Sequence, residues 1–136
     1  MSTLKNILLN KDSSCSSIWF MRQAGRYLPE FREIRSHNKN FIDLCFKSDL
    51  VTKITLQPID RYNLDSAIIF SDILLVPYAL GQDVKFVKDE GPVLSNFDVN
   101  IFLNNDNLSF TRKLKPVYDS IKKTREKLSN DKSLIS

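Results

Sequence analysis

The stretch NLDSAIIFSD, residues 63–72, decides the fold class of this chain. Its centre, Ala67 to Phe70, is a short and continuous apolar run between polar flanks. Strands that are covered on both faces, as in parallel sheets, carry such runs, whereas strands with one wet face alternate polar and apolar residues. We therefore expect a buried strand of a parallel sheet here, within an α/β protein.

Helices are predicted before this strand. Leu4 to Asn10 is expected to form a short helix. Pro29 is expected to open a second helix, because the N–H that proline lacks is not needed at the first helical position. Ser48 is the predicted N-cap of a third helix, which we expect to continue with a kink beyond Pro58.

A hairpin, a helix and a second strand are predicted after it. Gly81 is expected to cap a short helix, and residues 83–95, DVKFVKDEGPVLS, indicate a hairpin. Residues 100–107 are expected to be a loop, followed by an amphipathic helix over about residues 116–128. The closing LIS, residues 134–136, looks like the start of another buried strand, so we expect the chain to stop inside its fold.

Charge and composition exclude several classes of protein. The net charge of +4 is uneven, since residues 1–110 hold 12 Lys/Arg against 13 Asp/Glu and residues 111–136 hold 8 against 3. We interpret this basic end as the solvated face of a helix, while a basic nucleic-acid-binding module remains an alternative. The sequence has no apolar run long enough for a membrane span. Its N-terminus lacks the basic segment and the long apolar core of a signal peptide, so the cytoplasm is the expected compartment.

The residues that commonly bind metals are few. Two cysteines, Cys15 and Cys45, and a single histidine, His37, are too few for a four-ligand zinc site of Cys and His, so no metal is expected. We expect both thiols to be buried and His37 to lie on the surface. No glycine-rich phosphate-binding pattern occurs.

Asp72 directly follows the apolar run. The carboxyl ends of strands carry the functional residues of parallel-sheet and barrel proteins, so Asp72 is a candidate ligand-binding residue. Spacing alone equally favours a role in capping the following turn.

Arg22 and Arg26 lie four residues apart in an apolar setting, with Ala24 and Gly25 between them. Guanidinium groups match carboxylates and phosphates as planar forks, and the small residues would let an anion approach the backbone. Pairing of both arginines with acids elsewhere is an equally open reading. The candidate acids are Glu30, Asp43 and Asp49.

Two long blocks resemble a known family. WFMRQAGRYLPEFR, residues 19–32, and AIIFSDILLVPYALG, residues 67–81, closely resemble the uroporphyrinogen decarboxylase family of haem biosynthesis. Residues 50–65 between the blocks and DEGPVLS, residues 89–95, also fit. Two long motifs in the right order are far more specific than one short pattern.

The resemblance implies a (β/α)8 TIM barrel, which takes about 250 residues. At 136 residues, the chain is expected to be one incomplete domain with extra N-terminal helices, the first barrel strand and a β-hairpin. Residues 1–65 would supply the N-terminal helices and a substrate loop. Residues 66–136 would supply the first strand, the hairpin, a helix and the start of the second strand.

The resemblance also implies an activity: removal of the four acetate carboxyl groups of uroporphyrinogen III as CO2 to give coproporphyrinogen III. Neither a metal nor an organic cofactor is implied, and the family works as a homodimer. Asp72 would bind the central pyrrole N–H groups and stabilise the ring cation during catalysis. The implied substrate-binding segment consists of Arg22, Gln23, Ala24, Gly25 and Arg26.

Departures from the family pattern keep other readings open. The family's further Tyr, Ser or Thr, and His contacts lie beyond residue 136, and Tyr78 stands where Gln or His is more usual. We therefore expect little or no activity from this chain alone. The alternatives are a tetrapyrrole-binding remnant without catalysis and, with less support, corrinoid-linked methyl transfer, for which the zinc ligands are missing.

Overall fold

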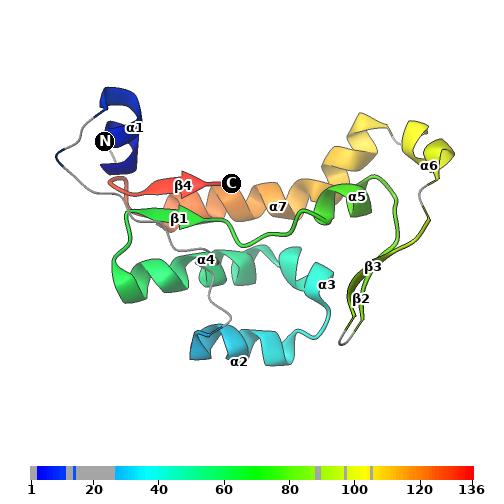
Figure 1. Cartoon of the computed structure of the whole chain (residues 1–136), viewed down its shortest axis with the longest axis horizontal. Helices are drawn as coiled ribbons and strands as arrows, with labels where there is room; N and C mark the ends of the chain where they lie inside the picture. The colour runs from blue at the N-terminus through cyan, green and yellow to red at the C-terminus, as the bar shows by residue number, and fades with distance from the viewer. Residues whose placement is uncertain (1–2, 12–13, 15–26, 88–89, 97, 105) are drawn as a thin grey trace.

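The computed structural model describes residues 3–11, 14, 27–87, 90–96, 98–104 and 106–136 (Figure 1). The elements follow in the order α1 (Thr3–Asn10), α2 (Pro29–His37), α3 (Phe41–Cys45), α4 (Ser48–Tyr62), β1 (Ser66–Ile68), α5 (Leu75–Ala79), β2 (Val84–Val87), β3 (Gly91–Leu94), α6 (Val99–Leu103), α7 (Asn107–Lys127) and β4 (Ser133–Ile135). The described part is thus an α/β arrangement of helices with two small sheets.

The buried strand predicted from the apolar run is β1, and it pairs in parallel with β4. Ala67 is fully buried and lies opposite Leu134 in the register. The hydrogen bond from Ile69 N to Ile135 O, at 2.9 Å, extends the pairing past the end of β1. β1 is shorter than predicted, because Phe70 N donates instead to the Thr55 hydroxyl of α4 at 3.0 Å.

Helices α4 and α7 pack against each other through a seam of small polar residues. Thr52, Ser120 and Thr124 are each at most 1% exposed. The Thr124 hydroxyl donates to the Thr52 hydroxyl at 3.3 Å. At one end of the seam, Lys123 Nζ donates to Ser48 Oγ at 2.9 Å. Short side chains let two helices approach closely, and the hydroxyls find partners within the seam.

Phenylalanine rings join the N-terminal helices to the strand and the hairpin. Phe70, just after β1, makes edge contacts with Phe31 of α2 and with Phe41 of α3, each with centroids 5.8 Å apart. Phe41 also contacts Phe86 of β2, with centroids 5.0 Å apart. Offset and edge-to-face geometries of this kind are the favourable ones for aromatic pairs. The rings therefore fix α2, α3 and β2 around the carboxyl end of β1.

Several sequence predictions are confirmed by the elements. A helix covers Leu4 to Asn10, Pro29 lies in the first turn of α2, and α4 continues through Pro58 to Tyr62. The antiparallel pair β2–β3 lies in the segment for which a hairpin is predicted. Gly81 follows α5 with φ +101°, the left-handed conformation that favours glycine after a helix.

Three sequence predictions are wrong: the N-cap of α4, the loop over residues 100–107 and the start of the last helix, which the next paragraph describes. Ser48 is not the N-cap of α4, because Lys47 holds that position and the Ser48 hydroxyl accepts from Lys123. The predicted loop over residues 100–107 is wrong for its first half, since α6 occupies Val99–Leu103, with the Asp98 carboxylate accepting from Asn100 N at 2.8 Å. Capping by an aspartate offsets the poor helix propensity of this asparagine-rich stretch.

The last helix begins nine residues before the predicted start at Pro116. Asp106 caps α7 by accepting from Ser109 N. Phe110 and Leu114, one turn apart, pack against the core in the part that the prediction missed. Burial of these two side chains outweighs the cost of Pro116 inside the helix.

Candidate functional site

An open cleft lies beside the carboxyl end of β1, and its volume is about 900 Å3. It is lined by Phe31, Arg32, Arg35, Ser36, Lys39, Phe41, Asp72 and Phe86. Three of these side chains are phenyl rings, three are cations and one is a carboxylate. An apolar surface with a few charged groups is what a binding site for a charged organic molecule requires.

The cationic side of the cleft comes from α2 and the turn after it. Arg32 and Arg35 are three residues apart in α2, and Lys39 lies in the turn after the helix ends at His37. Phe31 and Ile34 of the same helix are buried in the core, and Phe31 also borders the cleft. Packing of α2 against the core therefore turns its cations towards the cleft.

Arg35 is tied into the protein more firmly than the other two cations. Its guanidinium donates to the carbonyls of Asn38 and Lys39, the latter at 2.7 Å. Its Cζ lies over the Phe41 ring, 5.8 Å from the centroid, in a cation–π contact. Arg35 is thus held by backbone and aromatic partners.

Asp72 is the acidic group of the cleft, and it is half-buried. Its Oδ1 accepts a hydrogen bond from Leu74 N at 2.8 Å, which closes the turn after β1. The capping role that the sequence left open is therefore present. The same carboxylate also lines the cleft, so the two readings of Asp72 are compatible.

Cys45 is only 2% exposed, and the charges of Asp72 and Arg35 act on it. The pKa of its thiol is raised to about 12, mainly by burial and also by the charge of Asp72, while the charge of Arg35 acts in the opposite direction. Such a thiol stays protonated at neutral pH and is a poor nucleophile. Burial of Cys45 agrees with the prediction, and Cys15 lies outside the described residues.

The predicted substrate-binding segment, Arg22, Gln23, Ala24, Gly25 and Arg26, also lies outside the described residues. Two of the acids proposed as its alternative partners are paired with other cations. Glu30 and Arg61 form a two-bond fork, with both N–O distances at 2.9 Å. Asp49 Oδ1 accepts from Lys123 Nζ at 2.7 Å.

These two ion pairs lower the pKa of the carboxyl groups that take part in them. A hydrogen bond from its own backbone N–H and the fork from Arg61 lower the pKa of Glu30. The hydrogen bond from Lys123 lowers the pKa of Asp49. Both carboxylates therefore stay charged and paired at neutral pH.

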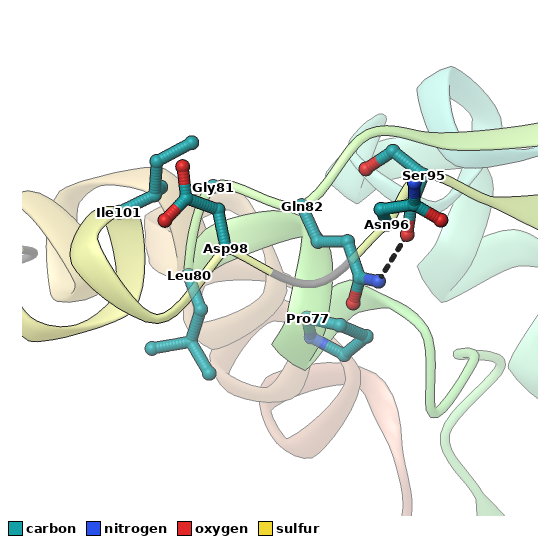
Figure 2. A pocket seen from close by; sticks show the side chains of 8 residues that line it. All are labelled: Pro77, Leu80, Gly81, Gln82, Ser95, Asn96, Asp98 and Ile101. Carbon is teal, nitrogen blue, oxygen red and sulfur yellow. Dashed lines mark hydrogen bonds between the residues drawn. The ribbon is translucent and has the colours of Figure 1, made fainter.

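A second, smaller pocket lies between α5, the end of β3 and α6, with a volume of about 90 Å3 (Figure 2). Gln82 spans it and donates from Nε2 to Ser95 O at 2.8 Å. Opposite, α6 packs so closely that a Cβ on Gly81 would lie 2.7 Å from Ile101 Cγ2. The pocket holds little more than a few water molecules, and we assign it no ligand.

Two kinds of feature are absent from the described part of the chain. No helix there is long and apolar enough to span a membrane. Over the same residues, no three side chains of His, Cys, Asp or Glu come together as they would around a metal ion. His37 is exposed, as predicted, with Nδ1 2.9 Å from Glu33 O.

Sequence reasoning found Asp72 and missed the other side of the cleft. Arg32, Arg35 and Lys39 were not singled out, although the spacing of Arg32 and Arg35 in the predicted helix was a usable signal. Phe86 carried no such signal, since only the fold of the hairpin brings it to Phe41.

Comparisons with known proteins agree with the resemblance seen in the motifs. The family model for "Uroporphyrinogen decarboxylase (URO-D)" matches residues 1–136. A curated uroporphyrinogen decarboxylase of Rickettsia felis is 48% identical over 131 residues, which cover 93% of this chain and 37% of the relative. The enzyme of Brucella ovis is 45% identical over 118 residues, covering 87% and 35%. The chain thus spans little more than a third of the length of these relatives, and it belongs to the uroporphyrinogen decarboxylase family.

Proposed function

We propose that this chain carries the substrate-binding part of a uroporphyrinogen decarboxylase, which removes the four acetate carboxyl groups of uroporphyrinogen III as CO2 and yields coproporphyrinogen III. The observation that carries the proposal is the charge arrangement of the cleft. The lining of the cleft combines a carboxylate that follows β1 with three cations and three phenyl rings. The substrate has the complementary form, with N–H donors at the centre of an apolar macrocycle and carboxylates at its edge.

Each part of the cleft has a role in this proposal. The phenyl rings pack against the pyrrole faces, and the cations bind peripheral carboxylates. Asp72 accepts hydrogen bonds from the central pyrrole N–H groups. When a proton adds to a pyrrole carbon, the ring becomes cationic, and the Asp72 carboxylate stabilises that charge as it develops. Loss of CO2 sends the electron pair of the broken C–C bond into the cationic ring and leaves an exocyclic CH2 group. A proton from water then adds to this CH2 to give the methyl group, and the proton added earlier leaves the ring carbon.

The segment from Arg22 to Arg26 completes the carboxylate-binding side of the site in our proposal. The pairing of Glu30 with Arg61 and of Asp49 with Lys123 supports this, because two of the three acids that could neutralise the arginines are engaged. We assign these arginines to carboxylate binding and not to proton donation, since a guanidinium is a very weak acid.

We further propose that the chain is the first part of a TIM barrel, with β1 and β4 as neighbouring barrel strands. Residues 1–65 then form the N-terminal helices and substrate loop, and residues 66–136 form the first barrel unit with its hairpin. The parallel pairing of β1 and β4 supports this arrangement. The whole enzyme is expected to be a cytoplasmic homodimer without metal or organic cofactor. A two-stranded sheet leaves its edges uncovered, so we expect no turnover from this chain alone.

The test is equilibrium binding of uroporphyrinogen, kept reduced under anaerobic conditions, to the 136-residue chain. We expect binding by the wild type, and we expect weaker binding by Asp72→Asn and by Arg26→Ala. The control is Asp60→Asn, which removes an exposed carboxylate of α4 that does not line the cleft. Equal affinity in all four proteins, or none in the wild type, would contradict the proposed site.

A further inference from the structure

We propose that Arg61 is a positioning residue of the substrate site, which keeps the Glu30 carboxylate from pairing with Arg26. This inference rests on the proposed function, because it takes Arg26 as a group that binds a substrate carboxylate. It assigns a role in binding to a residue that does not itself line the cleft. That role is to hold an acid that would otherwise compete with the substrate for a cation.

Glu30 is the acid closest to Arg26 along the chain, only four residues after it. Four residues span at most about 14 Å of chain even when fully extended, so two long side chains can meet across that separation. Within α2, no cation stands three or four residues after Glu30, since Glu33 and Ile34 occupy those positions. Arg32, two residues after Glu30, does not face it on a helix. Arg26 is therefore the nearest competing partner of this carboxylate along the chain.

The fork between Arg61 and Glu30 engages both oxygens of the carboxylate. Arg61 Nε donates to Oε1 and Nη2 donates to Oε2, each at 2.9 Å. The first turn of α2 lies beside the last turn of α4, so the two residues meet although 31 positions separate them in the sequence (Figure 1). Because the fork fixes the carboxylate and compensates its charge, pairing with a second cation gains less.

The core holds both partners of the fork in place. Glu30 lies between two buried side chains of the chain, since Leu28 is 2% exposed and Phe31 is 6% exposed. Arg61 reaches the start of α2 because α4 continues past Pro58 instead of ending there. The fork therefore joins two helix ends whose positions are set by packing, and it decides only where the carboxylate points.

The fork adds little to stability, so its loss can be measured in binding without unfolding the chain. The side chains of Arg61 and Glu30 are 45% and 29% exposed, and ion pairs so open to water contribute little to folding. The hydrogen bond from its own backbone N–H is the largest cause of the lowered pKa of Glu30, ahead of the bond from Arg61. Without Arg61, the carboxylate therefore stays ionised and is left without its partner, four residues from Arg26.

The experiment breaks the fork from each end and measures binding of uroporphyrinogen under anaerobic conditions. Arg61→Gln frees the carboxylate and should weaken binding about two- to five-fold, as for loss of one exposed charge pair. Glu30→Gln breaks the same fork without freeing an acid, so its affinity should not fall below that of the wild type. The double variant Glu30→Gln/Arg61→Gln should bind like the wild type. A purely structural role for the fork would instead weaken binding in both single variants and leave the double variant no better.

Two further comparisons separate pairing with Arg26 from a general change of net charge. In the Arg26→Ala background, Arg61→Gln should have no further effect on affinity, because the cation that Glu30 would neutralise is gone. A long-range charge effect would weaken binding equally in both backgrounds. The matched control is Lys115→Gln, which frees Asp119 from another exposed ion pair outside the cleft and should leave affinity unchanged.

The outcomes separate this inference from the function on which it rests. If the wild type binds and Asp72→Asn weakens binding while Arg61→Gln does not, the role of Arg61 is wrong and the proposed function stands. Equal losses from Arg61→Gln and Glu30→Gln, or additive losses from Arg61→Gln and Arg26→Ala, would also overturn the role of Arg61. Absence of binding by the wild type would overturn the proposed function and this inference with it.

Discussion

At the scale of single residues, Asp72 combines two tasks that can be separated by substitution. One oxygen accepts from Leu74 N, and the carboxylate carries the negative charge of the cleft. Asp72→Asn keeps an oxygen at the capping position and should leave the free energy of unfolding unchanged. Asp72→Ala removes the cap and should cost about 1 kcal/mol. Denaturant unfolding of the two variants measures the difference, and equal losses in both would contradict the capping role.

Cys45 predicts how stability depends on pH in alkaline solution. Its pKa is raised from 9.0 to about 12 in the folded chain, so the unfolded chain releases this proton at lower pH. The contribution is complete below pH 9 and is lost as pH rises from 9 to 12. Across this pH range, the free energy of unfolding should fall more steeply with rising pH for the wild type than for Cys45→Ala. Parallel pH profiles for the two proteins would show that the thiol does not titrate as described.

Gln57 is a buried amide without a hydrogen-bond partner within the described part of the chain. An unpaired buried amide costs about 1–3 kcal/mol. Gln57→Leu, which keeps a similar size, should therefore raise the free energy of unfolding. Gln82→Leu is the matched control and should lower it, because the Gln82 amide donates to Ser95 O at 2.8 Å. A lower stability for Gln57→Leu would mean that the amide is satisfied.

At the scale of elements, the contact between α4 and α7 depends on small side chains. Ser120 is fully buried there, and its backbone carbonyl is the acceptor for Thr52. Ser120→Leu should overpack the seam and destabilise the fold by about 1–3 kcal/mol. Lys122→Leu, an exposed position two residues later, should have little effect. Thermal unfolding compares them, and similar melting temperatures would show that the two helices can move apart at little cost.

Elements were predictable where an apolar pattern in the sequence corresponds to a buried segment of the structure. The apolar run at Ala67 indicated β1, and Leu134 indicated the start of β4. Helix α6 was missed because its asparagines suggest a loop, while the cap that offsets them, Asp98, carries no distinct pattern. The true start of α7 was missed because Pro116 is a helix opener in most sequences, and here tertiary packing of Phe110 outweighs it.

At the scale of the whole molecule, the sequence revealed one side of the cleft and the fold revealed the other. Asp72 could be found because it follows a buried strand. The cleft itself requires α2, α3, β1 and β2 to meet, and the contacts of Phe70 with Phe31 and Phe41, and of Phe41 with Phe86, bring them together. Contacts between residues so far apart in sequence leave no local pattern that could be read beforehand.

The central claim is that this chain supplies the substrate side of a decarboxylase, since it spans little more than a third of the relatives it matches. The most direct measurement is coproporphyrinogen formation by the 136-residue chain mixed with a polypeptide that spans the other part of the Rickettsia felis relative. We predict turnover by the mixture, none by either polypeptide alone, and loss of turnover with Asp72→Asn. Turnover by this chain alone, or full turnover by the Asp72→Asn mixture, would contradict the account.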